Sequence, residues 1–258
     1  MKLSELSKLK ETFKTMGDPL VWSPIQEDEE VLAEFELLVS KIEESKGWPK
    51  ERNHEKGKLL EKLTGIVLNR FNVAEVHSDF SVQDNQIDHE LEFIDLYVTN
   101  FTKEAGYKAV FECKNEKGKV DVSYMAKLIE LCETRKANLG IFISMQGITG
   151  QGWIYAEGKR KKNFLRKGIA IIHFTIDEIK ELKEKNFYTL MKLKFKMLVD
   201  EVDESLDDIE ELQRYSKEEQ STLSARLINN LDQFKKFGLI ENEDYEKIVA
   251  KVRDTYQE

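Results

Sequence analysis

Residues 107–115 read Tyr107-Lys-Ala-Val-Phe-Glu112-Cys-Lys114-Asn115, an apolar stretch that carries an acid and an amine two positions apart. Alternate side chains of a β-strand point to the same face, so a strand here places Val110, Glu112 and Lys114 together. A carboxylate beside an ammonium can bind a metal and handle water, because lysine is a compact charge whose pKa shifts near a metal or away from solvent. An isolated Glu-x-Lys pair is more often a salt bridge across a sheet, so its surroundings decide the interpretation.

Two further carboxylates precede this stretch. Asp88 closes the run Asp84-Asn-Gln-Ile-Asp88 at the beginning of a predicted strand, where aspartate is depleted unless it caps, turns or binds something. Glu61 lies on a predicted helix, with Gly57 and Gly65 one turn to either side. Three carboxylates and a lysine can therefore converge, and such oxygen ligands with added waters suit Mg²⁺ in phosphodiester hydrolysis.

Asp95 is an alternative to Asp88. A symmetric hairpin centred near Lys103 would place Asp95 opposite Glu112 on the neighbouring strand. The register depends on the geometry of the connecting loop, so both aspartates stay open, and the motif context favours Asp88.

The hydrophobic pattern predicts the order of the elements. Helical spacing of apolar residues covers 26–46 and 55–71, and β-rich runs follow near 73–82, 87–99 and 107–114. We expect the last two of these strands to form a hairpin through a polar loop.

Helical spacing returns after Gly118, and an apolar strand follows at 139–145. A helix between two strands of one sheet predicts a βαβ crossover with the two strands parallel. A Lys/Arg-rich helix and a further strand at 169–174 would extend the sheet. From Thr175 onward the pattern indicates helices alone.

These patterns predict three regions: an N-terminal helical extension over 1–50, an α/β core over 51–180 and an all-helical region over 181–258. The fold class is therefore α/β, a mixed sheet flanked by helices. The apolar stripes of the two helical regions need a surface to pack on, which predicts a homo-oligomer or a protein partner unless they pack on the core.

The motifs resemble the PD-(D/E)XK nucleases, in particular the Mrr-like restriction endonuclease branch. Lys58-Leu-Leu-Glu61 is similar to the helical glutamate of that branch, Asn85-Gln-Ile-Asp88 to its strand aspartate, and Phe111-Glu-Cys-Lys-Asn115 to its signature strand. Gly140-Ile-Phe-Ile-Ser144 resembles the strand after the second helix, so the likeness covers about residues 55 to 150. The proline of the family's name is missing before Asp88.

The resemblance implies a restriction-endonuclease-like fold and Mg²⁺-dependent DNA hydrolysis that leaves a 5′-phosphate, with Mn²⁺ as a substitute. Carried over to this sequence, Asp88 and Glu112 bind the metal, Lys114 orients or deprotonates the attacking water, and Glu61 supports the metal or its water. The implied role is restriction or anti-phage defence. The alternative is a non-catalytic, nuclease-like DNA-binding or scaffolding subunit, which would not need a divalent metal.

The charge pattern bears on DNA binding. The net charge of −9 argues against a protein that coats nucleic acid through bulk electrostatics. One dense basic run lies within 159–167, and we predict that it contacts nucleic acid through Lys159, Arg160, Lys161 and Lys162; a solvated helix face is the alternative. The nearby Trp153 could stack on a base.

The remaining features bound the class of protein. A chain of 258 residues can bury a hydrophobic core without disulfide bonds or structural metal ions. Its two cysteines, Cys113 and Cys132, lie in a predicted strand and a predicted helix, as expected of buried thiols in a reducing compartment. We predict a cytoplasmic protein without membrane segments, because no apolar stretch approaches about 20 residues. The segment from Leu231 to Val249 resembles the helical-hairpin module SHOCT, with a plain amphipathic helix pair as the alternative.

Overall fold

The structure is a computed structural model that describes residues 17–82, 85–95, 97–205, 228, 231, 235 and 241–256. The chain divides into two compact units, Met1–Val202 and Asp203–Glu258. The second unit contains α12 (Asn242–Tyr256), whereas much of the segment that resembles SHOCT lies outside the described residues. Across the described ranges, no helix is both long enough and apolar enough to span a membrane.

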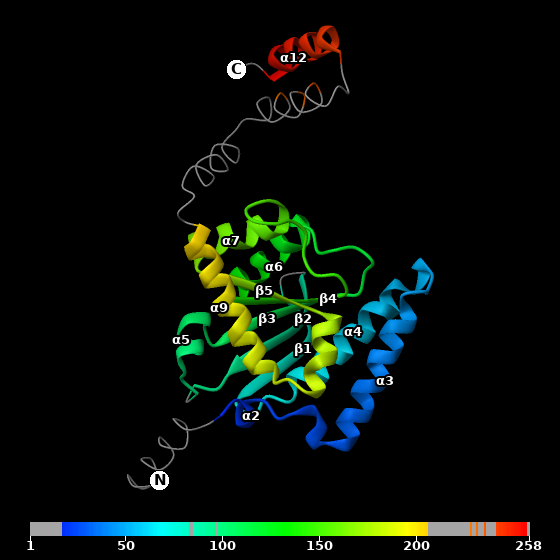
Figure 1. The fold of residues 1–258 in the computed structure, drawn as a ribbon, viewed down its shortest axis with the longest axis vertical. Helices are drawn as coiled ribbons and strands as arrows, with labels where there is room; N and C mark the ends of the chain where they lie inside the picture. The colour runs from blue at the N-terminus through cyan, green and yellow to red at the C-terminus, as the bar shows by residue number, and fades with distance from the viewer. Residues whose placement is uncertain are drawn as a thin grey trace. The chain divides into compact units, whose positions relative to one another are not determined.

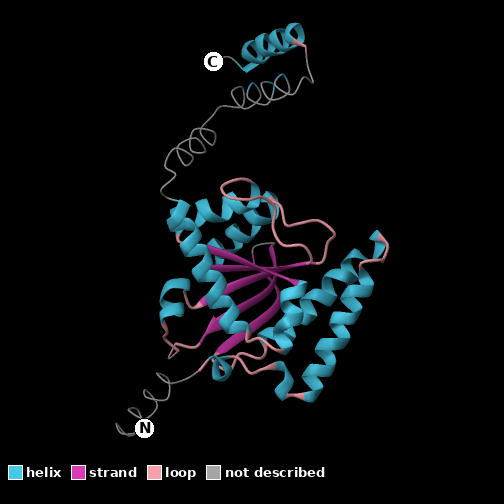
Figure 2. Cartoon of the chain, in the orientation of Figure 1, coloured by secondary structure: helices cyan, strands magenta, loops and turns pink. Residues whose placement is uncertain are grey.

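A five-stranded mixed sheet forms the centre of the first unit (Figures 1 and 2). Its strands lie side by side in chain order: β1 (Ala74–Val82), β2 (Asn85–Phe93), β3 (Lys108–Lys114), β4 (Leu139–Ser144) and β5 (Ala170–Thr175). The pairs β1/β2 and β2/β3 are antiparallel, and β3/β4 and β4/β5 are parallel. The helices α6 (Val122–Arg135) and α7 (Tyr155–Lys167) make the two parallel connections, so the predicted crossover is confirmed.

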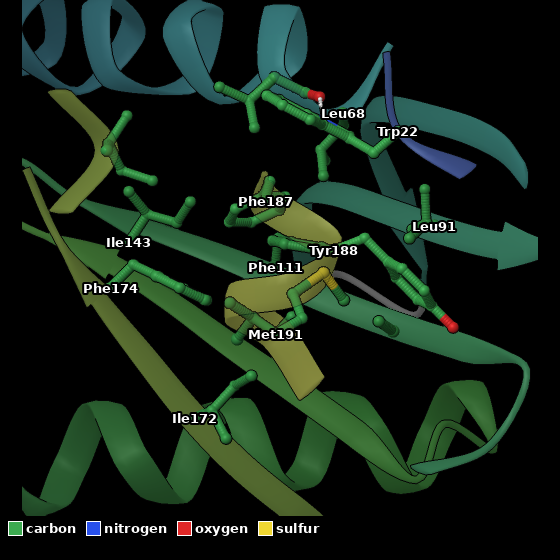
Figure 3. Packing of buried hydrophobic residues seen from close by; sticks show 14 of the residues in the cluster. Trp22, Leu68, Leu91, Phe111, Ile143, Ile172, Phe174, Phe187, Tyr188 and Met191 are labelled. Atoms are coloured by element: carbon green, nitrogen blue, oxygen red, sulfur yellow. Dashed lines mark hydrogen bonds between the residues drawn. The ribbon is translucent and has the colours of Figure 1, made fainter. Parts of the chain in front are cut away.

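Two hydrophobic clusters cover the two faces of this sheet. The larger one contains Phe111, Ile143 and Phe174 from the strands, and Phe187 and Tyr188 from α9 (Phe187–Ser205) pack against them (Figure 3). Aromatic rings within it meet edge-on or tilted, as their quadrupoles favour.

The smaller cluster lies on the opposite face, under α6. It contains Val110 and Phe142 from the sheet and Met125, Leu128 and Cys132 from α6. Because Val110 and Glu112 alternate with Phe111 along β3, Glu112 points to this face. Both cysteines are free and buried, as predicted.

From Gly17 onward, the described part of the predicted N-terminal extension packs into the core of the first unit. Trp22 is fully buried, and its Nε1 donates a hydrogen bond to the carbonyl of Val67 at 2.8 Å. Likewise Phe187 and Met191 lie in the larger cluster, so the first unit continues past the predicted boundary at 181. The remaining helices of this unit are α2 (Asp18–Val21), η1 (Ile25–Glu27), α3 (Glu29–Ser45), η2 (Lys50–Arg52), α4 (Asn53–Leu68), α8 (Ile176–Lys180) and η3 (Glu181–Lys183).

The connection from β2 to β3 differs from the expected hairpin. β2 ends at Phe93, and a short helix, α5 (Asn100–Ala105), occupies the segment predicted to be a loop. A capping box between Thr99 and Thr102 begins this helix. The predicted strand over 87–99 is therefore too long, because local capping by threonine favours helix there over continued extension.

Candidate active site

β3 carries the acid and the amine that the sequence places on one face. Glu112 is buried, and its Oε1 accepts a hydrogen bond from Nζ of Lys114 at 2.8 Å. Lys127 on α6 reaches the same oxygen, at 3.0 Å. Two ammonium groups thus hold one oxygen of a single buried carboxylate.

The second oxygen of Glu112 has no such support. Oε2 is buried and has no hydrogen-bond partner among the described residues. A buried carboxylate oxygen without a partner is costly, since it has lost its hydration without a replacement. The arrangement is therefore incomplete at this atom, and a cation or an ordered water would complete it.

Asp88 lies next to Glu112 on the neighbouring strand. The register pairs His89 with Phe111, so one further step along the two strands brings Asp88 to the level of Glu112. Oδ2 of Asp88 accepts a hydrogen bond from the backbone N–H of Cys113 at 2.7 Å. Burial, and then the charge of Glu112, raise the pKa of Asp88 to about 7.

A local irregularity of the β1/β2 ribbon surrounds Asp88. The pairs Ser78/His89 and Phe80/Ile87 flank Asp79, which has a positive φ of 51°. A non-glycine residue in this conformation marks a disturbed strand. Asp88 therefore lies opposite a distortion and not in the middle of a regular ladder.

Glu61 approaches from α4. Its Oε2 accepts a hydrogen bond from Lys58 at 2.6 Å, and Lys58 also binds Asp79 at 3.0 Å. The carbonyl of Glu61 accepts from His89, whose other ring nitrogen meets Ser78 at 2.8 Å. Because a carbonyl only accepts, Nε2 of His89 carries the proton and Nδ1 accepts from the Ser78 hydroxyl.

One cavity joins these groups. It has a volume of about 230 Å³, and Glu61, Asp88, Glu112 and Lys114 all line it. The four residues predicted from the sequence therefore meet in space, between α4 and α6 at the carboxyl end of β3.

The donor set fits a hard divalent cation in part. Two adjacent carboxylates, one with an unpartnered oxygen, suit Mg²⁺, which commonly binds one or two carboxylates and keeps several waters. In the described part of the chain, no three His, Cys, Asp or Glu side chains are already arranged as a metal site. Asp88 and Glu112 are accordingly the residues that could hold a metal, with Glu61 close enough to line the same cavity.

Asp95 does not take part in this arrangement. It lies exposed in a turn after the end of β2. The expected symmetric hairpin is replaced by a connection that includes α5, and the resulting register brings Asp88 towards Glu112. The fold of the β2–β3 connection therefore excludes Asp95 as the aspartate beside Glu112.

The basic run of α7 is buried at two of its four predicted nucleic-acid contacts. Arg160 is buried and pairs with Glu157 and, at 2.9 Å, with Glu201; Lys161 is buried and lies 3.4 Å from Glu201. This corrects the prediction that Arg160 and Lys161 contact nucleic acid. Trp153 is buried too, which removes it as a platform for a base. Lys159 and Lys162 are half-buried.

Sequence reasoning missed two residues that hold this site. Lys127 carries no motif, because a lysine on an amphipathic helix is common; only the position of α6 over β3 brings it to Glu112. His89 belongs to no motif either, yet its ring binds the backbone carbonyl of Glu61 from β2. Its place directly after Asp88 is the one signal that the sequence offers.

The fold and the site define a class. A mixed sheet with helices on both faces, and an acid-rich cavity at the end of a central strand, form a restriction-endonuclease-like α/β domain. Residues 56–174 match the Mrr catalytic-domain family, described as restriction endonuclease, and this segment contains all four cavity residues predicted from the sequence. The predicted resemblance is confirmed for this segment. No curated protein and no solved structure matches the chain.

Proposed function

We propose that this chain is a divalent-metal-dependent endonuclease that hydrolyses phosphodiester bonds of DNA. The observation that carries the proposal is the cavity in which Asp88, Glu112 and Lys114 meet, inside the segment that matches a restriction endonuclease family. Restriction or anti-phage defence is the setting that the same family resemblance favours. The proposed cytoplasmic location rests on the two buried free thiols, and the proposed homo-oligomer or protein partner rests on the apolar stripes of the helical regions.

Asp88 and Glu112 are the proposed ligands of Mg²⁺, for which Mn²⁺ would substitute. A bound divalent ion polarises the phosphoryl oxygen and lowers the pKa of water. The Oε2 atom of Glu112 supports this assignment, because it is a buried carboxylate oxygen without a hydrogen-bond partner among the described residues.

Lys114 is proposed to orient the attacking water and to stabilise charge on the phosphate. Burial would lower its pKa, but the carboxylates of Glu112 and Asp88 outweigh burial and raise it. Its amine is therefore protonated before substrate binds, which suits electrostatic stabilisation better than proton abstraction. Glu61, held by Lys58 and by the His89 bond to its carbonyl, is proposed to position the metal or its water.

Of the basic run, Lys159 and Lys162 remain proposed contacts to the DNA backbone. Phosphate contacts position a protein on DNA without reading sequence. Their replacement is expected to weaken binding of all DNA sequences alike and to reduce its salt dependence.

The test is cleavage of plasmid and linear DNA with Mg²⁺ or Mn²⁺, and folding of each variant is followed by thermal unfolding. We expect Glu112→Gln, Lys114→Ala and Asp88→Asn to lose cutting, and the matched control Asp95→Asn to keep it. If the wild type cuts nothing and binds no divalent metal, the non-catalytic DNA-binding or scaffolding role takes its place. Cutting by Glu112→Gln at the wild-type rate would reject the assigned site.

A further inference from the structure

A larger cavity adjoins the proposed active site. It has a volume of about 590 Å³ and shares Asn53, Asn115 and Glu116 with the smaller one. Its walls come from the turn between α3 and α4 and from the loop after β3. The size lies within the range of small-ligand pockets, roughly 300 to 1,000 Å³.

An aromatic ring forms part of the wall. Trp48 lines the cavity, together with Met145, and is only partly buried. The guanidinium of Arg52 lies 3.3 Å from the centroid of the Trp48 ring. A ligand must therefore use the second face or the edge of this ring, and a planar base is the kind of group that stacks there.

The charge of the wall favours an anion. Lys56 is 7% exposed, and its ammonium donates to the carbonyl of Trp48 at 2.8 Å. Among the described residues, no carboxylate forms an ion pair with Lys56, Lys50 or Lys117, although all three line the cavity. A buried ammonium that has only a carbonyl for a partner is poorly compensated, and a phosphate would supply the missing negative charge.

The other two charged side chains that line this cavity already have partners. Lys46 pairs with Glu43, so it contributes little net charge. Glu116 accepts a hydrogen bond from the Tyr124 hydroxyl at 2.9 Å. The wall thus keeps three lysines without an acidic partner, against one acid.

The cavity is tied directly to the catalytic strand. Asn115 follows Lys114, and its side-chain amide donates to the carbonyl of Lys56 at 2.8 Å and to Oγ of Ser45 at 3.4 Å. This side chain links the end of β3 to α4 and α3. A group held in the larger cavity is consequently held in fixed relation to Lys114 and Glu112.

We infer that the larger cavity takes one unpaired nucleotide of the substrate, next to the phosphate that is cut, with its base against Trp48 and its own phosphate near Lys56, Lys50 and Lys117. The inference rests on the proposed function and adds to it the state of the DNA substrate. A base can enter the cavity only where the DNA is single-stranded or where the base leaves its stack in the duplex. The ligand class is a nucleotide in single-stranded or locally opened DNA.

Trp48 offers a direct readout. The other two tryptophans, Trp22 and Trp153, are buried, so quenching by an added ligand reports on Trp48. The full chain is titrated in EDTA, which prevents cutting, with a short labelled single-stranded oligonucleotide. Tryptophan fluorescence follows occupancy of the cavity, and anisotropy of the label follows binding.

We expect saturable quenching that is absent in Trp48→Phe and that the same sequence as a duplex does not produce. Lys50→Glu with Lys117→Glu should weaken binding of the single strand at least about fivefold, as loss of a stacked and charge-compensated nucleotide implies. The matched control is Lys103→Glu with Lys196→Glu, which makes the same charge change at exposed lysines that do not line the cavity.

Three outcomes would overturn the inference: no binding of the single strand, binding without quenching, or equal weakening by both double variants. The outcome of the cleavage assay is independent of the outcome of the fluorescence titration. Quenching without any metal-dependent cutting keeps the nucleotide site and rejects the nuclease, whereas cutting without quenching keeps the nuclease and rejects this site.

Discussion

The backbone N–H of Cys113 donates a hydrogen bond to Oδ2 of Asp88 at 2.7 Å, and this bond joins two neighbouring strands at the carboxylates of the site. The partner lies between Glu112 and Lys114 in sequence, so the bond fixes Asp88 relative to both. It lowers the pKa of Asp88, but burial and Glu112 outweigh it and raise that pKa to about 7.

The first prediction concerns Asp88 and pH. In the unfolded chain aspartate titrates near 3.9, so the folded metal-free protein holds this proton more tightly. The contribution of Asp88 to stability is therefore greatest at low pH and is lost as the pH rises towards about 7. We expect Asp88→Asn to be more stable than the wild type at pH 8, by about 2 to 4 kcal/mol, and the gain to shrink below pH 5.

Urea unfolding in EDTA at several pH values measures this difference. Subtracting the variant from the wild type removes the titration of all other groups. The same raised pKa predicts that Mg²⁺ or Mn²⁺ binding at pH 6 releases protons, which calorimetry in two buffers of different ionisation enthalpy detects. A constant difference in stability from pH 5 to pH 8 would contradict the assignment.

The second prediction separates the two lysines that bind Glu112. Both lysines line the cavity, but the side chain of Lys114 is 19% exposed and that of Lys127 is 40% exposed. We expect Lys114→Met to lower single-turnover cutting by at least about 100-fold, since it removes a group that acts in the transition state. Lys127→Met should cost about tenfold, because Lys114 still holds Oε1 of Glu112. Lys62→Met, at an exposed pair with Glu34, serves as the control.

The third prediction concerns the buried ion pair of Glu90. Arg135 binds this carboxylate through two hydrogen bonds of 2.6 and 2.7 Å, and Lys108 lies 3.6 Å away. We expect Arg135→Met to destabilise the fold by about 3 kcal/mol, because it leaves a buried carboxylate with one distant partner. The double change Arg135→Met with Glu90→Gln should recover part of the loss.

The matched control for this pair is Lys183→Met, at the exposed pair with Glu36, which should cost less than about 1 kcal/mol. Burial raises the pKa of Glu90, but Arg135 and Lys108 outweigh it and lower the pKa. The stability from the pair is accordingly present at neutral pH and lost in acid. Chemical denaturation at pH 7 and pH 4 measures both effects, and an equal loss in the two single variants would contradict the prediction.

The fourth prediction tests a close approach in α7. A Cβ at Gly158 would lie 1.9 Å from the carbonyl oxygen of Trp153, which is backbone and cannot move aside on its own. We expect Gly158→Ala to destabilise by about 2 kcal/mol or more. Gly118→Ala, where a Cβ meets nothing within 4 Å, should change stability by less than about 0.5 kcal/mol. Thermal unfolding compares the two, and equal midpoints would refute the contact.

The sequence by itself determined the features that depend on neighbours along the chain. Alternation placed Glu112 and Lys114 on one face of β3, and helical spacing located α4 and α6. These features follow from backbone geometry with a period of two or about 3.6 residues, which the order of apolar and polar residues reveals directly. The crossover from β3 to β4 followed from the order of the elements and from chain connectivity.

Only the tertiary structure decided which distant groups meet. The register that brings Asp88, and not Asp95, to Glu112 depends on the connection through α5, which alternation does not encode. The burial of Arg160 against Glu201 depends on how α7 packs against α9. The reach of Lys127 to Glu112 likewise depends on α6 lying over β3, because its four-carbon stem spans a gap that exists only in the folded domain.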